Sequence, residues 1–201
     1  MIDQRFVLLG AAIGFAGGLS YFADTLRGRV RPNRVSWFLW SLAPLIAFAA
    51  EVRERVGLPA LMTLVVGVNP LLILAASFLS AGAAWKITRF DLACGFLSVA
   101  GLGLWYVTRQ GDLAIVFSIL ADALAAVPTL VKAVRAPESE SYIGFLGFGV
   151  SGAITLLALR RWTFANYAFP LYICLLCLLL ASLVRLRPQR LLGIGARSVA
   201  R

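Results

Sequence analysis

Seven long apolar segments, joined by short loops rich in arginine, are the feature that most constrains this chain. Hydrophobic residues make up 61% of its 201 residues and charged residues only 14%, a balance that does not fit a water-soluble domain of this size. A helix needs about 20 mostly apolar residues to cross a bilayer. The pattern therefore predicts an all-α polytopic membrane protein with seven transmembrane helices. The segments are 6–26, 35–50, 58–83, 92–107, 113–134, 142–159 and 164–184.

The basic residues predict how such a chain would be oriented. The 19 Lys and Arg residues outnumber the 9 Asp and Glu residues, and thirteen of them fall on the side that receives the C-terminus. Because cytoplasmic loops are enriched in basic residues, we expect a plasma membrane or cell inner membrane protein with its N-terminus outside. The excess charge then reports topology and argues against a nucleic-acid partner. The basic tail, 187–201, is expected to lie on the anionic cytoplasmic leaflet.

The absence of one residue type and the positions of others argue against several kinds of chemistry. It has no histidine, which removes the commonest general base and metal ligand, so we expect neither an enzyme nor a metal or other cofactor. Cys94, Cys174 and Cys177 lie inside apolar segments and are interpreted as packing residues. A retinal pigment would need a lysine in the last segment, and the only lysines are Lys86 and Lys132.

Two loops resemble each other and indicate an internal repeat. Segment 25–37 reads TLRGRVRPNRVSW and segment 129–142 reads TLVKAVRAPESESY, with matching residues at an offset of 104 before one inserted residue. Two three-helix units share one orientation only if a further span separates them. We therefore predict a 3+1+3 arrangement of parallel repeats. Its parts are a first repeat 1–84, a linker helix 85–112, a second repeat 113–186 and the tail 187–201.

The segment DALAAVPTLVKAVRAPESES, residues 122–141, resembles a PQ-loop motif. Pro128 matches its proline, Lys132 its basic position, and Ser139 and Ser141 its serine-containing loop, whereas Thr129 stands where glutamine is usual. The resemblance is to the PQ-loop and SWEET superfamily. It implies a small seven-helix transporter or receptor with an outside N-terminus.

The same resemblance implies hinges at prolines in the first two helices of each repeat. Pro44 and Pro128 match such positions, and we add Pro70 and Gly147 as candidates because proline and glycine both loosen a helix.

Asp122 is the first candidate for a functional residue. Inserting a charged carboxylate near the middle of a span costs about 2.5–3.5 kcal/mol, unless it is neutralised, paired with a cation or in contact with water. We favour a proton-coupling or substrate-contacting role over a protonated carboxyl group bonded to a neighbouring helix. Asp24 lies nearer the basic loop, where an ion pair with Arg27 or Arg29 is at least as well supported.

Two asparagines are candidates for a substrate site. The resemblance implies an asparagine from the third helix of each repeat, and Asn69 and Asn166 are the residues available. For Asn69 an interhelical hydrogen bond worth about 0.6 kcal/mol is an equally good interpretation.

Aromatic residues near the ends of the segments have two interpretations. Trp37, Trp40 and Tyr167 are candidates for stacking on a substrate, but tryptophans also form belts at membrane interfaces, and we favour the belt for Trp37 and Trp40.

Other residues are interpreted as structural. Gly10, Gly14 and Gly18 form a double GxxxG pattern typical of a close helix-packing face. Glu138 and Glu140 are interpreted as solvated loop charge.

Two classes of function remain. The first is a small-solute transporter for a sugar or an amino-acid-like substrate, perhaps proton-linked, that works by alternating access between two three-helix bundles. The second is a non-transporting membrane receptor or assembly factor on the same fold. The oligomeric state, including a homo-oligomer, stays open.

Overall fold

The computed structural model describes residues 2–53, 58–80, 85–108 and 111–187, and in these ranges it contains seven α-helices and no strand. This confirms the predicted all-α class. The helices are α1 (Phe6–Leu26), α2 (Arg34–Arg53), α3 (Leu58–Leu79), α4 (Arg89–Thr108), α5 (Gly111–Arg135), α6 (Tyr142–Leu157) and α7 (Phe164–Leu186), and the 3₁₀ helix η1 (Pro137–Ser139) precedes α6. The predicted boundary at residue 84 and the tail after Arg187 lie outside the described residues.

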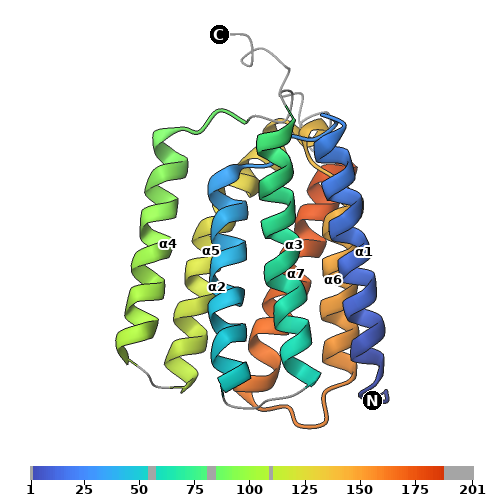
Figure 1. Ribbon diagram of the computed structural model, residues 1–201, viewed down its shortest axis with the longest axis vertical. Helices are drawn as coiled ribbons and strands as arrows, with labels where there is room; N and C mark the ends of the chain where they lie inside the picture. Colours follow the sequence, from blue (N-terminus) through green and yellow to red (C-terminus); the bar gives the residue numbers. More distant parts are fainter. Residues whose placement is uncertain (1, 54–57, 81–84, 109–110, 188–201) are drawn as a thin grey trace.

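Successive helices run in opposite directions along one bundle (Figure 1). The end at which α1, α3, α5 and α7 finish carries most of the described basic residues and is called the basic end. Its residues are Arg27, Arg29, Arg31, Arg34, Lys86, Arg89, Lys132, Arg135, Arg185 and Arg187.

The helices contact one another in two similar sets. In the first, α3 packs against both α1 and α2; in the second, α7 packs against both α5 and α6. The sets meet where α1 packs on α6 and α2 packs on α5, while α4 lies beside α5 at one side of the bundle (Figure 1). We call α1–α3 the first half and α5–α7 the second half. A side chain on α2 and one on α5 can therefore form a site between the halves.

Glycines allow α1 and α6 to approach closely. A Cβ atom added at Gly17 would lie 3.0 Å from the Cα of Gly147, and one added at Gly147 would lie 2.9 Å from the Cα of Gly17. Gly10 and Gly14, also on α1, face Ser151 and Ile154 of α6. The predicted packing face is thus confirmed for Gly10 and Gly14.

Two helices are long and apolar enough to cross a membrane by length and composition, Phe6–Leu26 and Asn166–Leu186. Two shorter apolar stretches of helix also occur among the described residues, Leu64–Leu79 within α3 and Tyr142–Leu157, which is α6. Large apolar side chains are exposed on all seven α-helices, from Phe15 on α1 to Leu175 on α7.

Gly147→Ala is expected to lower the free energy of unfolding by about 1–3 kcal/mol, because the new methyl group would meet backbone atoms that cannot rotate away. Thermal unfolding of the detergent-solubilised protein measures this. Gly103→Ala in α4 is the matched control, since its added Cβ has no atom within 4 Å. The control is expected to be neutral or more stable by up to about 1 kcal/mol. Equal effects at both positions would contradict the close-packing role.

Candidate functional site

Asp122 lies near the middle of α5 and is buried, with 8% of its surface exposed. The phenol of Tyr172, on α7, donates a hydrogen bond of 2.7 Å to its Oδ2 atom. The ring of Phe169 lies 6.0 Å from that of Tyr172. The intramembrane acid predicted from the sequence is therefore held within the second half by a neutral donor.

Trp40 brings the first half to the same carboxyl group. Its indole N–H, on α2, is buried near Asp122 and has no hydrogen-bond partner among the described residues. The sulfur of Cys177 on α7 is a further neighbour of Asp122. We call Asp122, Tyr172 and Trp40 the Asp122 site, which is built from α5, α7 and α2.

Asp122 differs from the other buried or half-buried carboxylates in how its charge is compensated. The Oδ1 atom of Asp24 lies 3.6 Å from the Nη1 atom of Arg29. The Oε1 atom of Glu140 lies 2.7 Å from the Nζ atom of Lys132. Asp91 accepts bonds at the N-terminus of α4 from Thr88 and Asn33, as in a capping box. Among the described residues, the hydrogen-bond donors near Asp122 are neutral. A negative charge there would have no positive counterpart in this part of the chain.

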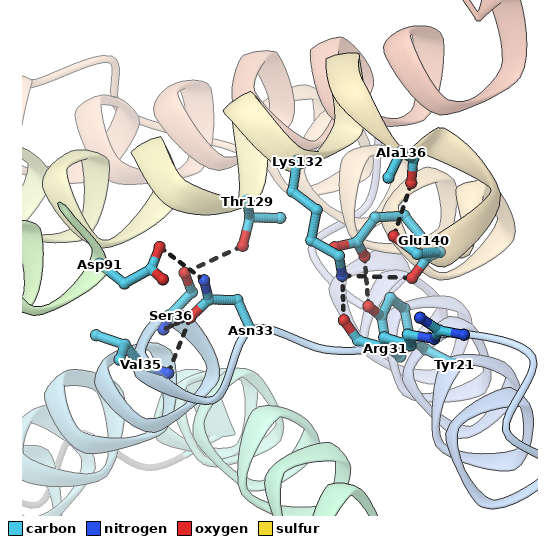
Figure 2. A network of polar contacts seen from close by, with 11 residues as sticks. Tyr21, Arg31, Asn33, Val35, Ser36, Asp91, Thr129, Lys132, Ala136 and Glu140 are labelled. Atoms are coloured by element: carbon cyan, nitrogen blue, oxygen red, sulfur yellow. Dashed lines mark hydrogen bonds and ion pairs between the residues drawn. The ribbon is translucent and has the colours of Figure 1, made fainter. Parts of the chain in front are cut away.

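A second buried polar cluster closes the basic end (Figure 2). Lys132 of α5 is only 1% exposed, and its Nζ atom donates to Glu140 Oε1 at 2.7 Å and to the carbonyl oxygen of Arg31. The other carboxylate oxygen of Glu140 accepts a hydrogen bond from the Tyr21 hydroxyl. The amide of Arg31 also donates to the carbonyl of Ser139 at 2.8 Å. These contacts tie α1 and the loop after it to α5 and the loop that precedes α6.

The cluster continues toward α4 through hydroxyl and amide groups (Figure 2). Thr129 on α5 donates to Ser36 on α2 at 3.0 Å. Asn33 accepts bonds from the amides of Val35 and Ser36 at the start of α2 and donates to Asp91 at 3.1 Å. We call the set formed by Tyr21, Asn33, Ser36, Asp91, Thr129, Lys132 and Glu140 the basic-end network.

The structure corrects the interpretation of Glu140 as solvated loop charge. Its side chain is buried and paired with Lys132, whereas Glu138 is exposed as expected. The ion pair predicted for Asp24 forms with Arg29. Gly18 also differs from the other glycines of its motif, because it faces Asn69 on α3 and not α6.

The interface-belt interpretation of Trp37 is wrong. Trp37 is only 1% exposed and packs against both Tyr21, at a ring-centroid distance of 4.6 Å, and Phe145, at 6.3 Å. Its ring is therefore covered and unavailable for stacking on a solute in this conformation. Trp40 is half-buried and packs edge-on against Trp37 at 5.2 Å.

The two candidate asparagines lie far apart along the bundle. Asn69 is buried and donates to the carbonyl of Gly14 on α1 at 3.2 Å, which is the interhelical bond considered from the sequence. Asn166 is exposed near the start of α7, where it donates to the carbonyl of Arg161 at 2.9 Å. Tyr167 packs beside Trp162 and Phe164 at the same end. Neither Asn166 nor Tyr167 reaches the Asp122 site.

The candidate hinge prolines Pro44, Pro70 and Pro128 all lie inside helices, as does Pro170. Their role in motion stays a prediction, as does that of Gly147. Cys94, Cys174 and Cys177 are buried free thiols, which agrees with packing roles. No group of three metal-binding side chains occurs among the described residues.

Searches of protein-family models, of curated proteins and of solved structures found no match to this chain. Its function must therefore be inferred from its own residues.

Lys132→Met is expected to destabilise the protein by about 3–5 kcal/mol, because it leaves the carboxylate of Glu140 buried without a cation. Glu140→Gln should also destabilise the protein, because it leaves the ammonium group of Lys132 buried without an anion. The double variant should regain much of the loss, since both charges are removed together. Thermal unfolding in detergent measures all three, and additive losses in the double variant would contradict the buried pair.

Proposed function

We propose that this chain is a seven-span membrane transporter for small solutes that works by alternating access between its two halves. The observation that carries the proposal is Asp122, a buried carboxylate at the junction of α2, α5 and α7 whose described partners are all neutral. Ionisable residues inside membrane helices usually mark a substrate or proton pathway, since they are costly to keep otherwise.

A membrane location is supported by the surface of the bundle. Helices of a soluble bundle present polar outer faces, but here large apolar side chains are exposed on every α-helix. The two helices that pass the length and composition criteria belong to different halves. Seven spans would place lipid against the exposed apolar side chains of all seven helices.

The orientation is proposed from the basic end. Its cluster of Arg and Lys residues fits the cytoplasmic side of a plasma membrane, which would leave the N-terminus outside. Exposed arginines such as Arg27, Arg29 and Arg135 would then lie beside the anionic leaflet.

Alternating access is supported by the similar packing of the two halves and by the resemblance to PQ-loop and SWEET proteins. The basic-end network holds the cytoplasmic end closed in this conformation. Lys132 and Glu140 both belong to the second half, so their ion pair can remain intact when that end opens. The bonds that must break include those from the pair to Tyr21 and to the Arg31 carbonyl. They also include the bonds from Thr129 to Ser36, from the Arg31 amide to the Ser139 carbonyl and from Ser141 to Asp24.

A non-transporting receptor or assembly factor is the second candidate. The observation in its favour is the apolar core of Tyr21, Trp37 and Phe145, which packs continuously across the junction of the halves. A static bundle would retain this core at all times, whereas a transporter would have to separate part of it.

Proton-coupled uptake tests the role of Asp122. In proteoliposomes that hold the purified protein, a proton gradient across the membrane, imposed in each direction in turn, is expected to accelerate uptake of a labelled sugar or amino acid in one of the two directions. Asp122→Asn should abolish the acceleration, because the amide cannot take up a proton. Asp24→Asn is the matched control, as Asp24 already has a cationic partner, and it should retain coupling. Coupled uptake unchanged in Asp122→Asn would exclude the proton role.

A disulfide between Ser36→Cys and Thr129→Cys tests the opening of the basic end. The two hydroxyl oxygens are 3.0 Å apart on different halves, so cysteines there should join on oxidation when the native cysteines are replaced. Oxidation is expected to stop uptake and reduction to restore it. Each single cysteine variant serves as a control and should be insensitive to the oxidant. Full cross-linking with undiminished uptake would favour the static alternative.

A further inference from the structure

Among the described residues, Asp122 lacks the charge compensation that the other buried or half-buried carboxylates have. Glu140 and Asp24 have Lys132 and Arg29 as partners, and Asp91 lies at a helix N-terminus with three donors. Asp122 lies in the middle of a helix, where the helix dipole offers no compensation. Its hydrogen-bond donor among the described residues is the Tyr172 phenol, and the Trp40 indole N–H lies nearby without a hydrogen bond. A charged state of Asp122 therefore needs a cation that these residues do not supply.

The side chains around Asp122 favour an organic cation over a metal ion. Metal ions such as Ca²⁺ require several oxygen ligands, whereas this site holds one carboxylate and one phenol among the described residues. The indole of Trp40 has an N–H donor and no lone pair to give to a metal ion, so it is not a metal ligand. The rings of Tyr172 and Phe169, whose centroids lie 6.0 Å apart, instead provide aromatic surroundings of the kind that stabilise ammonium groups.

We infer that Asp122 binds the positively charged group of an organic amine, and that a proton competes with this amine for the same carboxylate. The inference rests on the proposed transport function and names its substrate class. Because one carboxylate accepts either a proton or an ammonium group, release of one permits binding of the other. A transporter built on this site exchanges protons for organic cations across the membrane.

The pH dependence follows from the groups that face Asp122. These are Tyr172 and Cys177 from α7 and the non-titrating Trp40 from α2, while Ser98 of α4 contacts the neighbouring Ala121 carbonyl. Lowering the pH protonates Asp122 and removes the attraction for the amine. Amine binding should therefore weaken as the pH falls.

The first experiment measures binding without transport. Thermal unfolding of the detergent-solubilised full chain is followed with putrescine, choline and L-lysine as cationic probes and with D-glucose and L-glutamine as neutral probes, at two pH values. At least one cationic probe should stabilise the protein, more strongly at the higher pH. Asp122→Asn should weaken that binding by about tenfold to 100-fold, the range of a hydrogen bond to a charged group. Asp24→Asn should bind the probe as the wild type does.

The second experiment measures uptake of the same labelled probes into proteoliposomes with and without an outward proton gradient. Asp122-dependent binding and uptake of a cation supports both the inference and the proposed function. Asp122-dependent binding without uptake supports the cation site and overturns transport. Uptake of the neutral probes alone overturns the inference that the substrate is a cation, and it still supports the proposed transport function. Binding that is equal in the wild type and in Asp122→Asn, or the failure of every cationic probe to bind, overturns the inference.

Discussion

The buried ion pair between Lys132 and Glu140 is the interaction on which the joining of the two halves depends. Neither charge is accessible to solvent, so each must find its partners inside the protein. Glu140 accepts from Tyr21, and Lys132 donates to the Arg31 carbonyl, so the pair also binds both the first helix and the loop after it. Replacing such a pair by apolar residues often costs little stability. Its value here is positional, because it aligns groups from three separate segments.

The predictable part of this structure follows from local pattern. Apolar segments of about 20 residues indicated the helices, because a helix must present a continuous apolar surface to lipid or to its neighbours. The GxxxG spacing correctly indicated close packing for Gly10 and Gly14, since residues four apart share one helix face. Asp122 was also singled out from the sequence, because a carboxylate within an apolar segment is unusual; the structure shows it to be buried, and its functional role stays a prediction.

The remaining part depends on contacts between distant segments. Glu140 looked like loop charge because its partner Tyr21 is 119 residues away and because the loop folds inward instead of toward solvent. Spacing gives no indication that Tyr172 donates to Asp122 across 50 residues. Trp37 near a helix end resembled an interface residue, but its ring is buried against those of Tyr21 and Phe145. In each case the identity of the neighbour, and not the residue type, determines the role.

Helix α5 connects the Asp122 site with the basic-end network. Asp122 and Lys132 are ten residues apart on it, which is about 15 Å along the axis. Pro128 lies between them and cannot donate a backbone hydrogen bond to the preceding turn. The two parts of α5 can thus change their relative direction at lower cost than in an uninterrupted helix. In the proposed transporter, a proton or cation that binds Asp122 would change how α5 packs on α2 and α7, while Lys132 would keep its own partner. Helix α5 would then couple the occupancy of Asp122 to the basic end, because it carries both groups.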